Sequence, residues 1–286
     1  MVTEFTELQG EMGKEYALLD GEKPEVAQAI FEQYMPRFAG DILPQQEIGR
    51  ALSLADKLDN LAATFLRGLI PTGSQDPFAL RRQTIGAVNI LTDGKIHWDI
   101  RRGIEAALAL LPSEEETKKT VLSQIEDFFR QRIKAIMLDE GIAYDIIDAV
   151  LAGPVDDIYA LFLKARSMAE SQLKDEADLR QAVTRLANIT KGKTGGKVDP
   201  SLFTEDVEKK LQDAFEAASK KVLPLFAAYQ YGEALPVLKG LTAPINDYLD
   251  NVMVMVDDEA VKNNRISQLL ATLALFNTWG DFSKLV

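Results

Sequence analysis

The feature that most constrains the fold is a helical spacing of apolar residues, which recurs along nearly the whole chain. Residues 114–140 show it best, because apolar side chains return there every three or four positions. Ser113 can cap the first turn, the three glutamates that follow it suit the positive end of the helix dipole, and Gly141 can end the helix. The stripe consists of Val121, Ile125, Phe128, Phe129, Ile133, Ile136 and Met137. The spacing predicts one long amphipathic helix.

The same kind of stripe follows three other positions. One helix is predicted to open at Pro154, one to be capped by Thr204, and one to start near Asp257. Alternating strand patterns are nearly missing, so the predicted fold class is all-α. Two longer loops, at 68–78 and 190–201, are rich in Gly, Pro, Ser and Asp. We expect the second loop to be the more mobile one, because its glycines offer little to pack.

Composition excludes several classes of protein. The chain has 286 residues, which is enough for two domains, and it contains no Cys and a single histidine, His97. Disulfides, thiolate metal sites and most histidine-based hydrolases are therefore excluded, and a cytoplasmic location is expected. The sequence shows neither a signal peptide nor an apolar run long enough for a membrane helix. The net charge of −12 argues against a nucleic-acid partner unless cations cluster locally.

Asp56 is the residue that most resembles a metal ligand. The segment Leu54–Leu61 is similar to the last ligand helix of the HD phosphohydrolase superfamily, in which an Asp completes a site built largely from His residues. The preceding segment 30–36 offers Gln33 where an imidazole would be needed, and a carboxamide is a weak ligand. The expectation is an HD-like helical domain with no metal and no catalytic residue. The simplest alternative for Asp56 is a solvated helix face.

Residues 192–197, Gly-Lys-Thr-Gly-Gly-Lys, superficially resemble a phosphate-binding loop. The spacing of the motif fails, Val198 follows the second lysine, and the preceding segment is helical rather than a strand. ATP binding at this loop is therefore not expected, and no cofactor is assigned to this chain.

The charge around that loop is more informative. Residues 180–197 contain five Lys or Arg and no acidic residue, which stands out in an acidic chain. Arg185 and Asn188 lie three positions apart and share one helix face. Arg can grip a phosphate or a guanine edge, and Asn can pair with a base edge. The window is a candidate RNA contact, although a flexible solvated loop would have the same composition.

Three groups of motifs together resemble one family, the β subunit of bacterial glycyl-tRNA synthetase. The most specific run is Pro-Thr-Gly-Ser at 71–74 followed by Ala-Leu-Arg-Arg at 79–82. The matching stretches are 4–13 with 16–17, 55–59 with 68–82, and 185–189 with 248–255 and 263–266. In this order and spacing, the stretches extend over nearly the whole chain. The family's β subunit is far longer, so the expectation is that this chain is its C-terminal portion.

The resemblance implies an architecture and a set of partners. It implies a degenerate HD-like domain at 1–112, connecting helices at 113–177, and a DALR-type anticodon-binding helical bundle at 178–286. It also implies a separate α subunit that carries out the chemistry with ATP and magnesium, an α2β2 assembly, and tRNA(Gly) as the RNA partner. Two departures are Gln33, where many relatives carry His, and Gln75, where Lys is common.

The function expected from these observations is tRNA binding for glycine–tRNA ligase, with no catalysis by this chain alone. The rival interpretations are an HD-type phosphohydrolase acting on nucleotides, which the histidine count disfavours, and a helical protein-interaction scaffold. Candidate RNA contacts are Arg185, Asn188, Lys191, Lys193, Lys197, Asn251 and Arg265.

Overall fold

The computed structural model describes residues 5–285 and contains no β-strand among them, so the predicted all-α class is confirmed. The chain divides into two compact units, one made of the described residues up to 136 with 155–159, and the other of 137–154 with the described residues from 160 on. The first boundary falls within a helix, whereas the sequence suggested divisions at 112 and 177. None of the described helices is both long enough and apolar enough to cross a bilayer.

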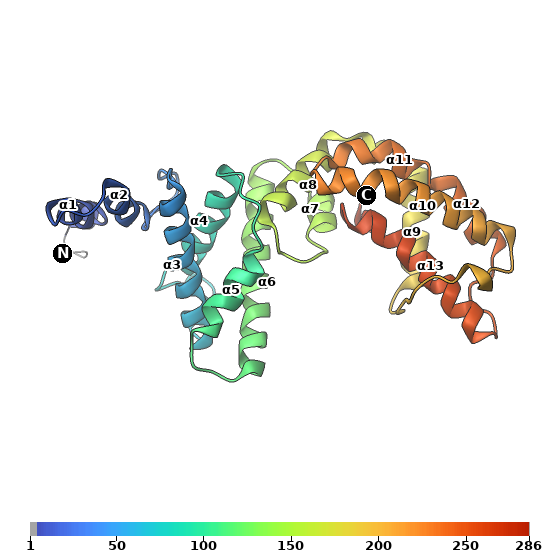
Figure 1. The fold of residues 1–286 in the computed structure, drawn as a ribbon, viewed down its shortest axis with the longest axis horizontal. Helices are drawn as coiled ribbons and strands as arrows, with labels where there is room; N and C mark the ends of the chain where they lie inside the picture. The colour runs from blue at the N-terminus through green and yellow to red at the C-terminus, as the bar shows by residue number, and fades with distance from the viewer. Residues whose placement is uncertain (1–4, 286) are drawn as a thin grey trace. The chain divides into compact units, whose positions relative to one another are not determined.

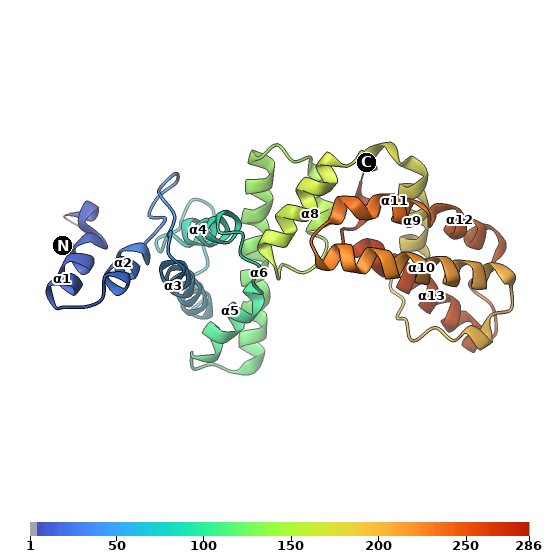
Figure 2. The same cartoon turned by 45° about the horizontal axis from the view of Figure 1, so that its top comes forward.

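Unit 1 is centred on its third helix (Figures 1 and 2). Its helices are α1 (Glu11–Leu19), α2 (Pro24–Glu32), α3 (Glu47–Leu66), α4 (Leu80–Asp93), α5 (Ile100–Ala109) and most of α6 (Glu115–Asp139), with a short 3-10 turn, η1, at Thr6–Leu8. α3 packs against α2, α4 and α5. Leu58, Leu61 and Phe65 face this core, and the Phe65 ring meets Phe128 of α6 edge to face at 5.2 Å. This packing holds the polar face of α3 at a surface cavity.

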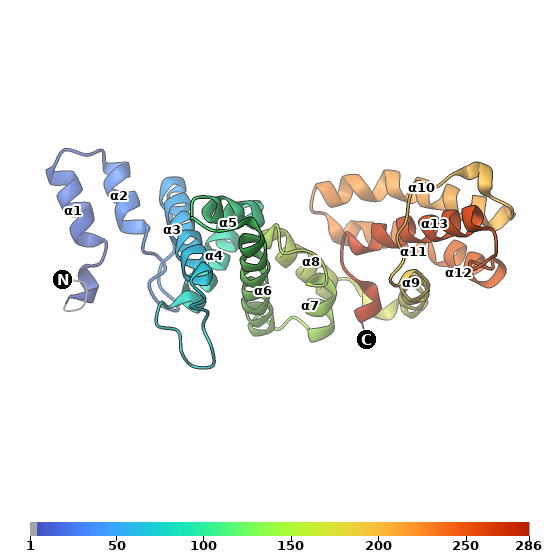
Figure 3. The same cartoon turned by 90° about the horizontal axis from the view of Figure 1, so that it is seen from below.

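Unit 2 is a bundle in which α9, α10, α12 and α13 pack together (Figure 3). Its helices are α7 (Tyr144–Val150), most of α8 (Ile158–Glu170), α9 (Ala177–Thr190), α10 (Asp206–Ala227), α11 (Leu235–Lys239), α12 (Thr242–Asn251) and α13 (Glu259–Asn277). The 3-10 turns are η2 (Gln172–Asp175), η3 (Pro200–Leu202), η4 (Tyr231–Ala234) and η5 (Phe282–Lys284). Trp279 is fully buried, and its indole N–H donates to the backbone oxygen of Lys164 at 3.2 Å. The indole therefore ties the end of α13 to α8.

Several helices start at positions that differ from the predicted ones. The helix expected from Pro154 begins at Ile158, because the preceding residues run beside the start of α5, where the Ile100 N–H donates to the oxygen of Asp156 at 2.8 Å. The cap of α10 is Glu205 rather than Thr204, in a reciprocal capping box with Glu208. The last helix is capped by Asp258, one residue from the predicted start.

The long helix was predicted closely at both ends. α6 begins at Glu115, so Ser113 lies before it, and it ends at Asp139. Gly141 follows with a φ of 82°, a left-handed conformation that glycine adopts without strain. The helix α7 was not predicted, because its seven residues are too few to show a repeating apolar stripe.

Candidate nucleic-acid interface

α9 presents the first two candidate contacts. Its inner face buries Leu179, Val183 and Leu186 in the bundle, which turns the opposite face outward. Arg185 is half-buried, and Asn188, one turn later, is exposed. The prediction that the two share one face of a helix fits this arrangement.

Arg185 is held by α12. Its guanidinium donates to the Asn246 amide oxygen at 3.1 Å and to the Asp250 carboxylate at 2.6 Å. These contacts orient the guanidinium, and they leave further N–H groups for another acceptor. Asp250 also places a negative charge beside the cation. An RNA phosphate would therefore meet a pre-oriented but partly neutralised arginine.

The loop after α9 carries three exposed lysines, Lys191, Lys193 and Lys197. They lie along the outer side of an otherwise neutral Gly-rich segment. Exposed ammonium groups on long side chains can approach phosphates, but they do not discriminate between bases. With Arg185 and Asn188 these lysines form the surface that we call the α9 edge.

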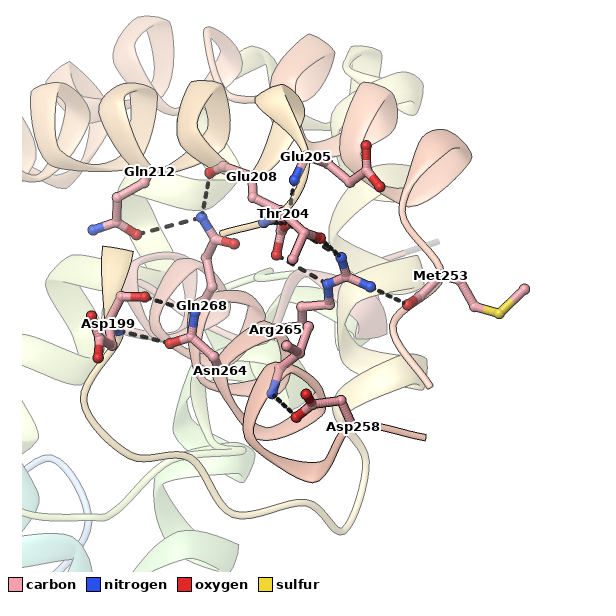
Figure 4. A network of polar contacts seen from close by, with 11 residues as sticks. Asp199, Thr204, Glu205, Glu208, Gln212, Met253, Asp258, Asn264, Arg265 and Gln268 are labelled. Atoms are coloured by element: carbon pink, nitrogen blue, oxygen red, sulfur yellow. Dashed lines mark hydrogen bonds and ion pairs between the residues drawn. The ribbon is translucent and has the colours of Figure 1, made fainter. Parts of the chain in front are cut away.

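The backbone of this loop is fastened to α13, contrary to the expectation that its glycines leave it with little to pack. The Asp199 N–H donates to the Asn264 side-chain oxygen at 2.7 Å, and the Asn264 amide donates back to the Asp199 oxygen at 3.0 Å (Figure 4). The Gly196 N–H donates to Ser267 Oγ at 2.9 Å. A Cβ added to Gly195 would come within 3.0 Å of a Leu270 methyl. Glycine here permits close packing as well as turning.

Arg265 occupies a different environment from the other candidates. It is 4% exposed, and its Nε donates to Glu208 at 3.0 Å. Its two other nitrogens donate to the Met253 oxygen at 2.7 Å and to Thr204 Oγ1 at 2.6 Å (Figure 4). A guanidinium with these partners links α10, α13 and the segment after α12. The expected RNA contact does not fit this burial, and we assign Arg265 a structural role.

The buried pair shifts both ionisation equilibria toward the charged forms. Burial by itself would raise the pKa of Glu208, but hydrogen bonds from Arg265 and from two backbone N–H groups outweigh it and lower that pKa. The hydrogen bond to Glu208 raises the pKa of Arg265. Beside the pair, Tyr248 is fully buried, and its hydroxyl has no hydrogen-bond partner among the described residues. Burial raises the pKa of this phenol.

Asn251 lies at the end of α12 and is exposed. Its amide donates to the backbone oxygen and the carboxylate of Asp247, each at 2.9 Å. These two hydrogen bonds orient the Asn251 side chain, which nevertheless remains accessible. Asp247 and Asp250 bring negative charge to this end of α12, which limits how closely a phosphate can approach.

Asp56 lies in unit 1, next to the residue that replaces the expected imidazole. The Gln33 amide donates to the Asp56 carboxylate at 3.3 Å, and the Asn60 amide donates to it at 3.4 Å. His97 pairs with Asp157 at 2.8 Å and packs against Tyr159. Within residues 5–285, no cluster of three or more His, Asp or Glu side chains is arranged to hold a metal ion. The surroundings of Asp56 offer amide donors instead of ligands.

Sequence reasoning missed the residues that position the α9 edge. Asn246 and Asp250 orient Arg185, and Asn264 and Ser267 fix residues 191–199, which we call the lysine loop. A signal was present for the second pair, since α13 carries polar residues at helical spacing where an apolar stripe would be expected. The side chains concerned, all buried, are Asn264, Arg265, Ser267, Gln268 and Thr272.

Comparisons with known proteins identify the family. A family model described as glycyl-tRNA synthetase beta subunit matches residues 1–152. The glycine–tRNA ligase beta subunit of Clostridioides difficile (strain 630) is 44% identical over 287 residues, covering 100% of this chain. Those of Desulforamulus reducens and Shouchella clausii are 42% and 40% identical, again covering 100% of the chain.

The alignments also show how much of each relative this chain represents. It spans 42% of the length of each of these three curated relatives. The family model nevertheless matches more than half of the chain. The chain therefore belongs to the glycyl-tRNA synthetase β-subunit family.

Proposed function

We propose that this chain is the tRNA-binding portion of a glycine–tRNA ligase β subunit, and that the α9 edge of unit 2 contacts tRNA(Gly). The observation that carries the proposal is the lysine loop, whose three ammonium groups are exposed while its backbone is fixed to α13. A fixed cationic loop beside an oriented arginine suits a phosphate backbone, because little further ordering is needed on binding. Membership of the glycyl-tRNA synthetase β-subunit family supports tRNA as the class of RNA.

The finer architecture belongs to the same proposal. Residues 1–112 would form a degenerate HD-like domain, residues 113–177 connecting helices, and residues 178–286 a DALR-type bundle that contacts the anticodon. The Gln33 amide beside Asp56 supports the loss of a metal site in the first domain. The position of Arg185 and Asn188 on one outward face of α9 supports base recognition in the last.

Two kinds of contact are expected at the α9 edge. Lys191, Lys193 and Lys197 would attract phosphates whatever the RNA sequence. Replacing all three with Ala should therefore weaken the binding of all tRNAs by a similar factor and make the affinity less dependent on salt. Arg185 and Asn188 would read a base edge. Replacing either should cost about 1–3 kcal/mol for tRNA with a glycine anticodon, and less for an altered anticodon. Asn251 is a third accessible candidate for such a contact.

The test measures affinities for both tRNAs at two salt concentrations. The matched control replaces Lys210, Lys220 and Lys221, three exposed lysines of α10, with Ala, which changes the net charge equally. If the loop variant and the α10 variant weaken binding by the same amount, only bulk charge matters and the α9 edge is not the site. Equal losses for cognate and altered anticodons would show that Arg185 and Asn188 do not read bases. A chain that binds no tRNA at either salt would favour a protein-interaction scaffold.

The catalytic step is assigned to a different subunit. In this proposal the α subunit uses ATP and magnesium to activate glycine, and the two subunits work as an α2β2 assembly in the cytoplasm. Glycyl-adenylate formation should therefore be undetectable with the purified chain. Turnover by this chain without the α subunit would refute the division of labour.

A further inference from the structure

A polar cavity in unit 1 has no role in the proposed tRNA surface. It has a volume of about 400 Å3 and opens between α3, α4 and the segment that follows α2. α3 and α4 pack side by side in Figures 1 and 2. The ionisable groups that face the cavity are Tyr34, Arg37, Asp56, Lys57 and Arg82. Three of these are cations and one is a carboxylate, in a chain whose net charge is −12. The cavity therefore has the opposite charge from the protein as a whole.

Lys57 forms part of the cavity wall and is 3% exposed. Its ammonium donates to the Met35 backbone oxygen at 2.8 Å and to Ser53 Oγ at 2.6 Å. Both acceptors are uncharged, and no carboxylate among the described residues lies within ion-pair distance of it. Burial lowers the pKa of Lys57 to about 8, with the charge of Asp56 acting in the opposite direction. A buried cation without a counterion is stabilised when an anion arrives.

The two arginines differ in how many of their N–H groups are free to donate a hydrogen bond to a ligand. Arg37 is engaged with Asp41 through Nε at 2.9 Å and Nη2 at 3.2 Å. The Arg82 side chain is exposed and makes no hydrogen bond or ion pair with the side chains and backbone that the structure describes. A guanidinium has five N–H donors in a planar fork that matches the oxygens of a phosphate. Arg82 is thus the group at the cavity that is available to a ligand.

We propose that this cavity binds a phosphate group, with Arg82 as the gripping cation and Lys57 as the buried charge behind it. The volume is sufficient for a phosphate and part of the molecule that bears it. The Asn60 amide also lines the cavity, but it already donates to Asp56 at 3.4 Å and to Gln83 at 3.2 Å, so the two cations carry the proposed binding. Asp56 is the single carboxylate in the wall, and its charge opposes the anion. The site is separate from the α9 edge, so it does not depend on the proposed tRNA contacts.

Inorganic phosphate and pyrophosphate are the probes, titrated calorimetrically into the purified chain at pH 7. Replacing the exposed Arg82 with Ala should weaken binding about tenfold, as expected for loss of a charge-assisted hydrogen bond. The matched control is Arg81→Ala, since Arg81 precedes it on α4 but donates to the Gly73 oxygen outside the cavity. That variant should bind within about twofold of the parent, because it retains every cavity group. Asp56→Asn should strengthen binding.

Proton uptake tests the part played by Lys57. Near pH 8.5 a bound anion should raise the pKa of Lys57, so that the amine takes up a proton released by the buffer. The binding enthalpy should therefore depend on the ionisation enthalpy of the buffer. Lys57→Met keeps much of the side-chain volume and should abolish this dependence. Failure to bind either probe at millimolar concentration would overturn the proposal. So would equal affinities for the parent and Arg82→Ala, a result that does not depend on whether Lys57→Met folds.

A final arm distinguishes a free phosphate compound from an RNA backbone as the source of the phosphate. If RNA supplies it, Arg82→Ala should lower tRNA affinity and pyrophosphate should compete with tRNA. If a free compound supplies it, tRNA affinity should be unchanged in Arg82→Ala and pyrophosphate should not compete. Either result keeps the phosphate site and assigns its ligand. Because the α9 edge variants are measured separately, failure of that surface would not affect this test.

Discussion

Among the side chains that the structure describes, each unit buries one cation, and the two cations have opposite kinds of surroundings. Arg265 in unit 2 is 4% exposed and faces Glu208 at 3.0 Å, and the hydrogen bond to that carboxylate raises its pKa. Lys57 in unit 1 is 3% exposed, donates only to neutral oxygens, and has its pKa lowered to about 8 by burial. The first charge is part of a completed network. The second is a buried charge without a counterion, beside a cavity.

The comparison separates a structural role from a binding role. A paired buried charge fixes the relative positions of the elements that supply its partners, because either member alone would be costly. A buried charge without a counterion lowers the stability of the folded state, and an anion that binds beside it offsets that cost. Arg265 therefore accounts for the geometry of unit 2, whereas Lys57 points to a ligand of unit 1.

The largest expected effect comes from breaking the pair in unit 2. Arg265→Met leaves the Glu208 carboxylate buried without its cation, which should lower the free energy of unfolding of that unit by about 3–5 kcal/mol. Urea unfolding followed by the fluorescence of Trp279, in a Trp98→Phe background, measures it. The double variant with Glu208→Gln should lose less than the sum of the two single changes. Additive losses would mean that the two side chains do not depend on each other.

The next effect is the pH dependence of unit 1. Lys57 has a folded pKa of about 8 against an ordinary value of 10.5, so the unfolded state binds more protons between these pH values. Stability should therefore rise from pH 8 to about pH 10.5, by on the order of 2–3 kcal/mol. Unfolding followed by Trp98, in a Trp279→Phe background, measures this gain.

Lys57→Met should remove that pH dependence and leave unit 1 at least as stable as the parent at pH 7, since the desolvated charge is gone. Lys119→Met, at an exposed position of α6, is the control and should keep the parent's profile. A parent profile that stays flat from pH 8 to 10.5 would show that the Lys57 ammonium is not desolvated as its burial implies. The contrast with Arg265 would then fail.

The smallest effect concerns the fastening of the lysine loop. Asn264→Ala removes two hydrogen bonds to the Asp199 backbone and should cost about 1–2 kcal/mol. It should also speed amide hydrogen exchange at Gly196 and Asp199, which report directly on the loop. The control is Asn263→Ala, because the side chain of Asn263 is exposed. If exchange in the loop is unchanged in the Asn264 variant, the loop is held by other contacts.

Much of the fold could be predicted because local rules determine it. The stripe of α6, its acidic first turn and Gly141 all act within a few residues, and they placed each end of that helix within one position. The start of α8 was displaced from Pro154 by contacts with α5, which local rules do not include. The cap of α10 moved to Glu205 because Thr204 turns its hydroxyl to Arg265. The errors arose where a hydrogen bond to a residue far away in the sequence replaced the local interaction that was expected.

By itself, the sequence determined the all-helical class, the absence of thiol and multi-histidine chemistry, and, through its motifs, the family. These follow from periodicity, composition and residue order, which need no tertiary contact. The tertiary structure alone decided which basic residues remain accessible. Arg265 and Arg185 cannot be told apart from the sequence. In the structure Arg265 is buried against Glu208 and cannot reach a ligand, whereas α12 orients Arg185 and leaves it accessible. Charge is a property of a residue, whereas its availability depends on partners that are far apart in the chain.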